Sequence, residues 1–212
     1  MDSKAHWEQV YETKRSDEVS WYQADPTTSL ALIQRVAPDR SVCILDVGAG
    51  TSLLVDRLLA AGYARVTVLD LSGTALKAVG DRLPPELRSR VKLIEADVLK
   101  TELPPHSVDV WHDRAVFHFL IERADRCAYV AQVQRALRPG GHVIVSTFAE
   151  DGPTTCSGLP VARYDSAGLH AIFGARFELL DSVREQHITP SGGRQAFQYC
   201  VCRMRAASSQ AA

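Results

Sequence analysis

The segment Ile44-Leu45-Asp46-Val47-Gly48-Ala49-Gly50-Thr51-Ser52 decides the fold of this 212-residue chain. It overlaps an apolar run, residues 41–47, that predicts a buried β-strand ending at two glycines. Residues 51–61 then have helical spacing and end at Gly62. Glycines between a strand and a helix let the backbone turn tightly, and the free N–H groups of the helix start can face a ligand. The segment therefore predicts a ligand-binding turn.

Strand-like and helical segments alternate from this turn to residue 148. Further strands are predicted at residues 65–70, 91–96, 108–113 and 142–148. Ser72 is a natural N-cap for a helix to about residue 83, Pro84-Pro85 closes that region, and residues 126–137 form the next helix. Regular alternation of this kind predicts a parallel sheet with helices on both faces.

The last third of the chain has a different pattern. A short helix at residues 165–173 precedes strands at 177–183 and 195–202, which the turn Pro190-Ser191-Gly192-Gly193 joins as an antiparallel hairpin. We therefore expect an α/β fold: a doubly wound, seven-stranded, mainly parallel sheet with an antiparallel C-terminal hairpin, in three α/β/α layers. The expected division is a helical and aromatic lid segment at residues 1–40, the main domain at 41–205 and a frayed tail at 206–212.

Two glycines after a strand do not by themselves identify a cofactor. The dinucleotide fingerprint needs a third small residue, and Leu53 stands at that position, where its bulk hinders close helix–strand packing. Asp46, just before the turn, repels a pyrophosphate but suits a cationic cofactor such as S-adenosylmethionine, which carries a sulfonium and an ammonium group. A nicotinamide oxidoreductase is therefore a disfavoured alternative.

Carboxylates stand near the ends of four predicted parallel strands, at Asp46, Asp70, Asp97 and Asp113. Ligands of such sheets bind outside the carboxyl ends of the strands. Asp70 is well placed to accept hydrogen bonds from both ribose hydroxyls, and Asp97 from an adenine amino group. A single aspartate at a strand end more often caps a helix, but four in register with a glycine turn favour a binding site.

Several motifs between residues 41 and 148 resemble those of the class I, Rossmann-like S-adenosylmethionine-dependent methyltransferases. They are the glycine turn, Val68-Leu69-Asp70-Leu71-Ser72, Glu95-Ala96-Asp97-Val98, and Leu137-Arg138-Pro139-Gly140-Gly141 before a strand. The resemblance implies strand order 3-2-1-4-5-7-6, S-adenosylmethionine as cofactor and S-adenosylhomocysteine as product. Ser52 departs from it, because many members have a third glycine there.

By the same resemblance, Asp46 and the glycine turn hold the methionine part, Asp70 holds the ribose, and Leu71 packs on the adenine. The residues that we expect to bind the cofactor are Asp46, Gly48, Ala49, Gly50, Thr51, Asp70, Leu71, Asp97, Val98, Asp113 and Trp21.

The end of the fourth strand faces the methyl group in that family. Here Asp113-Arg114-Ala115-Val116-Phe117 is partly similar to the Asp-Lys-Gly-Thr segment of some protein-lysine methyltransferases. The rings of Trp21 and Tyr22 can cover a sulfonium. Our candidate substrate residues are Tyr22, Arg114 and Phe117, and our candidate general base is His118, ahead of His112. A lone histidine is more often structural, so both readings stay open.

Composition narrows the function classes. A formal net charge of -1 and 46% hydrophobic residues predict a soluble, cytoplasmic protein with no nucleic-acid or membrane partner. Five cysteines without a secretory signal are expected to be structural thiols. No cluster of histidine, cysteine and carboxylate residues has the spacing of metal ligands, so we expect no metal.

The expected activity is S-adenosylmethionine-dependent methyl transfer to a small-molecule acceptor by in-line displacement. Residues 150–164 are a short insertion that leaves little structure to grip a macromolecule. A protein-lysine methyltransferase is the first alternative, and a catalytically inactive partner protein with a methyltransferase fold is the second. Intact Asp46, Asp70 and Asp97 argue against the inactive protein. The sequence does not set the oligomeric state.

Overall fold

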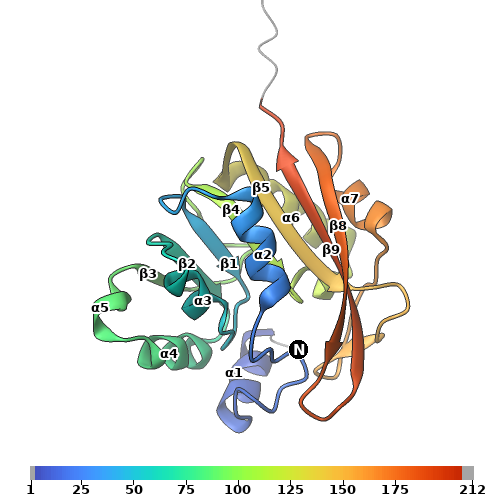
Figure 1. The fold of residues 1–212 in the computed structure, drawn as a ribbon. Coiled ribbons are helices and arrows are strands. Elements are labelled where there is room, and N and C mark those ends of the chain that lie inside the picture. The colour runs from blue at the N-terminus through green and yellow to red at the C-terminus, as the bar shows by residue number, and fades with distance from the viewer. Residues whose placement is uncertain (1–2, 207–212) are drawn as a thin grey trace, which may run out of the picture.

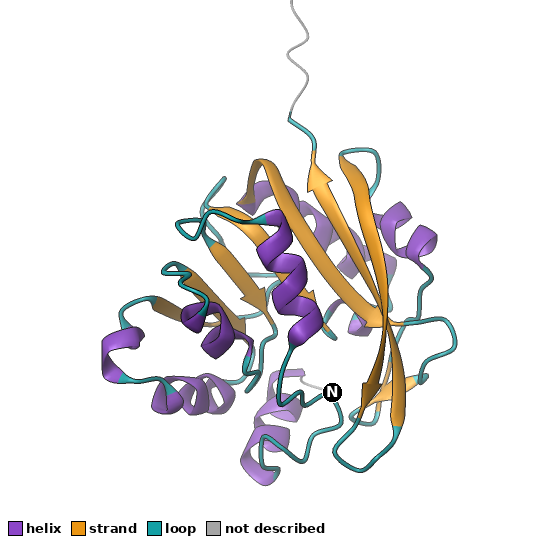
Figure 2. Cartoon of the chain, viewed as in Figure 1, coloured by secondary structure: helices purple, strands orange, loops and turns teal. Residues whose placement is uncertain are grey.

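The computed structural model describes residues 3–206 as a seven-stranded sheet between layers of helices (Figure 1, Figure 2). The strands of the sheet are β1 (Ile44–Val47), β2 (Val66–Asp70), β3 (Val91–Glu95), β4 (Val108–Arg114), β5 (Leu137–Phe148), β8 (Phe177–Ile188) and β9 (Arg194–Met204). Their order is β3-β2-β1-β4-β5-β9-β8, which confirms the expected seven-stranded order. Strands β1 to β5 pair in parallel, whereas β9 is antiparallel to β5 and to β8. A separate hairpin consists of β6 (Thr155–Cys156) and β7 (Leu159–Pro160).

Helices cover both faces of the sheet. On one face, α2 (Thr27–Val36), α3 (Leu54–Ala60) and α4 (Gly73–Arg82) pack into a first core. On the other face, α6 (Arg123–Ala136) and α7 (Ser166–Phe173) pack into a second core. Figure 1 shows α2 across the near face, with α6 and α7 behind the sheet. The remaining helices are α1 (Ser3–Thr13), the single turn α5 (Pro85–Arg88) and the 3₁₀ turn η1 (Phe117–Phe119).

Alternation along β4 decides which of its side chains can meet the turn after β1. Val110 belongs to the first core and Trp111 to the second. Because successive side chains of a strand point to opposite faces, His112 and Arg114 lie on the side of the first core, and Asp113 lies on the side of the second. The same alternation in β9 puts Cys200 and Cys202 together in the second core.

Several element boundaries differ from the sequence prediction, and two of the differences have a clear structural cause. Helix α3 begins at Leu54 rather than at residue 51, because the chain makes a further turn in which the Ser52 hydroxyl accepts a hydrogen bond from the Leu54 N–H. Strand β5 begins at Leu137 rather than at residue 142, because Leu137 pairs with Val108 beyond an irregularity in the β4–β5 ladder. Residues 138–141, expected to lie between the preceding helix and the strand, are therefore part of the strand.

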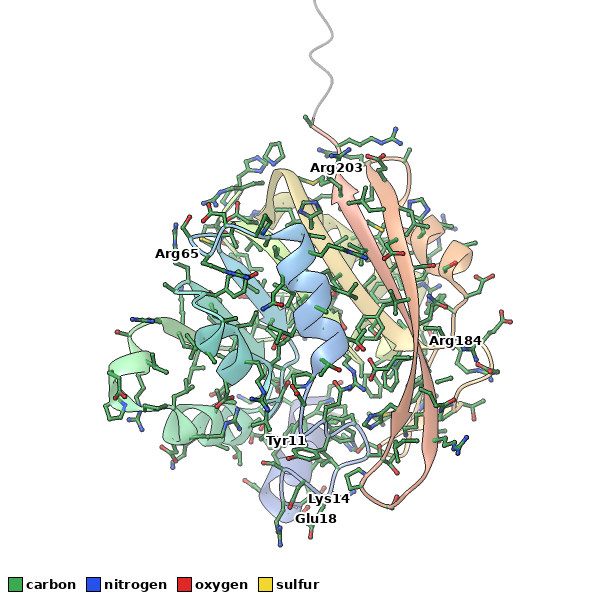
Figure 3. All side chains as sticks on the ribbon, viewed as in Figure 1. Tyr11, Lys14, Glu18, Arg65, Arg184 and Arg203 are labelled. Atoms are coloured by element: carbon green, nitrogen blue, oxygen red, sulfur yellow. The ribbon has the colours of Figure 1, made fainter. Side chains whose placement is uncertain are left out.

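Helix α1 packs near the carboxyl ends of the parallel strands and contacts α4 (Figure 1). Figure 3 shows Tyr11 between α1 and the sheet, while Arg65, which precedes β2, lies at the opposite end of the sheet. The N-terminal segment is thus at the end of the sheet where a ligand is expected. Except for Ala206, the expected tail lies outside the described residues. Among residues 3–206, no helix is long and apolar enough to cross a bilayer.

Candidate active site

The turn after β1 requires glycine at two positions. Gly48 and Gly50 have φ angles of 58° and 54°, in the left-handed region that favours glycine. A Cβ atom on Gly48 would overlap Cγ2 of Val116, and a Cβ atom on Gly50 would overlap the Tyr11 hydroxyl. A larger residue would therefore displace the segment after β4 or helix α1, both of which close around the turn.

A cavity of about 230 Å³ lies beyond the ends of β1, β2 and β4. The predicted cofactor residues in its lining are Trp21, Gly48, Asp70, Leu71, Asp97 and Val98. A smaller cavity of about 40 Å³ adjoins the same turn. The predicted residues in its lining are Trp21, Tyr22, Asp46, Gly48, Ala49, Thr51 and Arg114. Arg114 also lines the larger cavity, so the two cavities share the wall that Trp21, Gly48 and Arg114 form.

Asp70 ends β2 with its side chain almost fully buried. Its Oδ2 accepts a hydrogen bond from the Gly50 N–H at 2.7 Å, and its Oδ1 accepts one from the Ser72 N–H at 2.8 Å. Burial, together with the negative charges of Asp46 and Glu8, raises the pKa of Asp70 to about 6, although the two backbone bonds act in the opposite direction. Each oxygen keeps a lone pair for a further donor. Asp70 is thus an acceptor on the wall of the larger cavity.

Asp46 is held by residues of two other elements. It pairs directly with His112 in the β1–β4 register, and Nδ1 of His112 lies 2.7 Å from its Oδ1. Nε2 of His112 lies 2.9 Å from Oγ of Ser29 in α2. All three residues are buried. The arrangement gives the buried carboxylate a partner and fixes its orientation beside the glycine turn.

Helix α1 is attached to the site through Glu8. The Glu8 carboxylate accepts hydrogen bonds from the N–H groups of Gly73 at 2.6 Å and Thr74 at 3.2 Å, and from the Ser72 hydroxyl at 2.9 Å. Although burial acts to raise it, hydrogen bonds from Thr74, Ser72 and Gly73 hold the pKa of Glu8 below its usual value. The ionised carboxylate of Glu8 therefore caps the start of α4. This helix start follows Asp70 closely in the sequence.

Four aromatic rings form a cluster at the larger cavity. The ring centroids of Trp7 and Phe119 are 5.2 Å apart, and those of Trp7 and Trp21 are 5.7 Å apart. Tyr11 lies 6.4 Å from both Trp7 and Trp21. Three of the four rings come from residues 7–21, so the N-terminal segment supplies most of an aromatic wall.

Asp113 and Phe117, predicted to bind cofactor and substrate, line neither cavity. Asp113 points to the second core, where its Oδ2 accepts a hydrogen bond from the Tyr129 hydroxyl at 2.5 Å. Phe117 is fully buried and packs on Tyr129 and Phe173. The structure does not bring these two residues to the site.

His118, the candidate base, lines neither cavity and is fully buried in η1. Its Nδ1 accepts a hydrogen bond from the Phe148 N–H at 3.4 Å. Burial, and then the charge of Arg114, lowers the pKa of His118 to about 3. The imidazole is therefore neutral near pH 7, and its position gives the assignment as a base no support.

Sequence reasoning missed Glu8 and Ser29, and ranked His112 below His118. One signal for Glu8 was present: Trp7 and Tyr11 are four residues apart, so an amphipathic helix puts both on one face, and Glu8 is next to that face. No local pattern marks Ser29, because its role depends on α2 crossing β4.

The described residues add no metal site. No group of three histidine, cysteine or acidic residues within residues 3–206 is arranged to hold an ion. All five cysteines are free, and Cys156, Cys200 and Cys202 are buried. Burial raises the pKa of each of these three thiols to about 12, so they are protonated at neutral pH.

Comparison with known proteins shows that the chain is similar to methyltransferases. A family model described as a methyltransferase domain matches residues 45–145. An uncharacterised methyltransferase of Mycobacterium tuberculosis is 29% identical over 118 residues, which are 56% of this chain and 56% of that protein. The match thus spans little more than half of the relative. The eEF1A lysine and N-terminal methyltransferase of Bos taurus is 24% identical over 153 residues, 68% of this chain and 21% of that protein.

A solved structure has the same fold. The 1,6-didemethyltoxoflavin-N1-methyltransferase of Burkholderia thailandensis, with bound 1,6-didemethyltoxoflavin and S-adenosylhomocysteine, superposes with a TM-score of 0.76 at 22% identity. The superposition covers 95% of this chain and 87% of that one. The strand order, the glycine turn and the family match agree: residues 45–145 match the methyltransferase domain, and the chain has the fold of the class I, S-adenosylmethionine-dependent methyltransferases.

Proposed function

We propose that this chain transfers the methyl group of S-adenosylmethionine to a small-molecule acceptor. One observation carries the proposal. The larger cavity joins Asp70 and Leu71 at the end of β2, Asp97 and Val98 after β3, and the glycine turn after β1. These are the positions that the family resemblance assigns to the ribose, the adenine and the methionine part of the cofactor.

The residues of the cavity fit that cofactor. Asp70 has a free lone pair on each oxygen for the two ribose hydroxyls. Leu71 and Val98 offer apolar surface to adenine, and Asp97 adds an acceptor. Asp46 offers a negative charge to the ammonium group from the smaller cavity. Ala49 and Thr51 line the same smaller cavity and belong to the proposed cofactor site. Tyr22 also lines this cavity, as a proposed substrate residue.

Bound S-adenosylmethionine supplies an electrophilic methyl group on a sulfonium, which leaves as a neutral thioether. The task of this chain is therefore to align the acceptor and to exclude water. The ring cluster of Trp7, Trp21 and Phe119 suits both tasks, and its faces suit a cation.

A small acceptor is favoured over a protein lysine by two features. The N-terminal segment covers the larger cavity with Trp7 and Tyr11, which narrows access for a folded partner. Arg114 adds a guanidinium at the end of β4, where it opposes a lysine ammonium. The eEF1A lysine methyltransferases among the relatives keep a protein substrate as the alternative.

Calorimetric titration tests the cofactor. Both S-adenosylmethionine and S-adenosylhomocysteine should bind at sub-millimolar concentration, and NADH should not. Asp70→Ala should weaken both adenosyl ligands by about 1.5–3 kcal/mol, the scale of hydrogen bonds to a charged group. Asp81→Ala, on the exposed side of α4, is the matched control and should leave both affinities unchanged. If neither adenosyl ligand binds to the parent chain, the proposal fails.

A labelling experiment separates the two acceptor classes. The purified chain is incubated with methyl-labelled S-adenosylmethionine and either a small-metabolite fraction or a macromolecular fraction of a cell extract. We expect label in the small-metabolite fraction. Label confined to protein, at lysine, would support the alternative.

A further inference from the structure

The two carboxylate oxygens of Asp46 have different surroundings. Oδ1 lies 2.7 Å from Nδ1 of His112. Oδ2 makes no hydrogen bond to any of residues 3–206, and it is not one of the side-chain atoms that are buried without a partner. Oδ2 therefore keeps accessible surface, and Asp46 lines the smaller cavity. One oxygen is thus held by the protein, while the other is open to a ligand.

His112 is held at both ring nitrogens. An ionised carboxylate only accepts hydrogen bonds, so Nδ1 carries the proton in the bond to Asp46. Nε2 lies 2.9 Å from Oγ of Ser29, and in the neutral ring it accepts the hydroxyl proton. Oγ of Ser29 also lies 3.4 Å from the Tyr199 hydroxyl. Ser29 and His112 are 1% and 2% exposed, so water hardly competes for these bonds and the imidazole keeps one orientation.

The same order of serine, histidine and aspartate occurs in hydrolases, where the serine attacks the substrate. In this chain Ser29 belongs to α2 and is almost fully buried. A nucleophile has to be reached by the substrate, so the burial of Ser29 argues against that role. What the arrangement does accomplish is to orient the Asp46 carboxylate.

The smaller cavity has the size of a small polar group. Its volume is about 40 Å³. A single water needs about 10–15 Å³, so an ammonium group fits there and a nucleoside does not. Asp46 is the one acidic side chain in the lining among residues 3–206. The cation in that lining, Arg114, forms an ion pair with Glu185 at 3.9 Å, which offsets its repulsion of a second cation.

We propose that His112 and Ser29 are positioning residues for the amino group of S-adenosylmethionine, because they hold Asp46 with Oδ2 open to the smaller cavity. The inference rests on the proposed function, because it concerns the cofactor of the same reaction. A carboxylate that is already oriented does not have to rearrange when the ammonium group arrives. His112 acts through Asp46 and takes no proton from the methyl acceptor.

The test compares three ligands of the full chain by calorimetry. They are S-adenosylhomocysteine, S-(5′-adenosyl)-4-thiobutyrate, which lacks only the amino group, and 5′-methylthioadenosine, which lacks the whole amino-acid end. The parent chain should bind S-adenosylhomocysteine about ten- to hundredfold more tightly than the thiobutyrate, the scale of a hydrogen bond to a charged group. A substitution that only loosens the fold weakens all three ligands together and leaves this preference unchanged.

Two substitutions at His112 form a matched pair. His112→Asn keeps an amide donor at the position of Nδ1 and should keep the preference within about threefold. His112→Gln extends its amide toward the position of Nε2 and leaves Oδ1 of Asp46 without its donor. An unpaired buried carboxylate turns away or becomes neutral, so the preference should fall by about fivefold or more. A preference that His112→Gln leaves unchanged or increases would overturn the proposal.

A double variant shows whether His112 acts through Asp46. Asp46→Asn alone should lose the preference, and His112→Gln added to it should lower the preference no further. A further loss would contradict the positioning role. If His112→Gln does not fold, Ser29→Ala decides. The preference should then fall by about two- to tenfold, the scale of a neutral hydrogen bond, and an unchanged preference would refute the proposal.

The same titrations separate this inference from the proposed function. If the parent chain binds S-adenosylhomocysteine and the thiobutyrate equally well, the amino group has no carboxylate partner, and the inference fails while the proposed function stands. If the parent chain binds none of the three adenosyl ligands, the proposed function itself fails.

Discussion

Nδ1 of His112 lies 2.7 Å from Oδ1 of Asp46, at directly paired positions of β4 and β1. This hydrogen bond joins β1, which leads into the glycine turn, to β4, which ends at Arg114. Ser29 of α2 contacts the other ring nitrogen at 2.9 Å. Because all three residues are buried, the loss of one partner leaves another polar group unpaired in the core.

His112→Phe should therefore be strongly destabilising. We expect it to lower the free energy of unfolding by about 3–5 kcal/mol, because the Asp46 carboxylate loses its buried partner. Ser29→Ala is the matched comparison and should cost about 1 kcal/mol, because only a neutral hydroxyl is removed. Urea denaturation followed by circular dichroism measures both. Equal losses in the two variants would show that His112 does not stabilise Asp46.

Glu8→Gln should speed the release of S-adenosylhomocysteine. The Glu8 carboxylate holds α1 against the start of α4, and the charge on this cap is lost in the amide. A charge at a helix N-terminus contributes about 0.3–1 kcal/mol, so dissociation should become roughly two- to fivefold faster in stopped-flow experiments. Glu12→Gln, an exposed site on the same helix, is the control. Equal rates in both variants would mean that α1 does not limit release.

Because of Asp70, cofactor affinity and fold stability should change with pH in opposite directions. Its pKa of about 6 lies above the ordinary value, so the folded chain holds this proton more tightly than the unfolded chain. Its contribution to stability is full below pH 4 and is lost as pH rises through about 6. Affinity for S-adenosylhomocysteine should rise over the same interval, because the ionised carboxylate is the better acceptor for ribose.

Asp70→Asn provides the reference for that experiment. The difference between the parent chain and Asp70→Asn, measured from pH 4.5 to 7.5 by calorimetry and by urea denaturation, isolates the contribution of this group. Affinity that does not change with pH in the parent chain would place the ribose elsewhere.

The fold was predictable because its determinants are local. The apolar run before Gly48, the N-cap at Ser72 and the turn at residues 190–193 each specify a neighbouring element, and all three hold in the structure. The boundaries were less predictable. Leu137 joins β5 because Val108 lies opposite it across the sheet, a contact that residues 137–141 do not encode by themselves.

The candidate site was predictable only in part. Asp70 and Asp97 follow strand ends, and the parallel topology brings both to one cavity. Asp113 also lies at a strand end, but side chains alternate along a strand, and its neighbours His112 and Arg114 face the cavities instead. Adjacent residues of β4 therefore have different places: one side chain lies at the candidate site, and the next lies in the opposite core.

Asp113→Asn tests that distinction. Oδ1 of Asp113 accepts hydrogen bonds from the N–H groups of Val116 at 3.1 Å and Phe117 at 3.3 Å, and Oδ2 accepts one from the Tyr129 hydroxyl. The Tyr129 hydroxyl in turn accepts a hydrogen bond from Nε1 of Trp111 at 2.8 Å. An amide replaces one acceptor oxygen with a donor, so Asp113→Asn should lower the free energy of unfolding by about 1–3 kcal/mol.

The same variant should keep its affinity for S-adenosylhomocysteine, since the Asp113 side chain lines neither cavity. Asp70→Asn, by contrast, should weaken the binding of S-adenosylhomocysteine. Calorimetry and urea denaturation on both variants form a double comparison. A loss of affinity in Asp113→Asn with unchanged stability would return Asp113 to the cofactor site, and the alternation argument for β4 would be wrong.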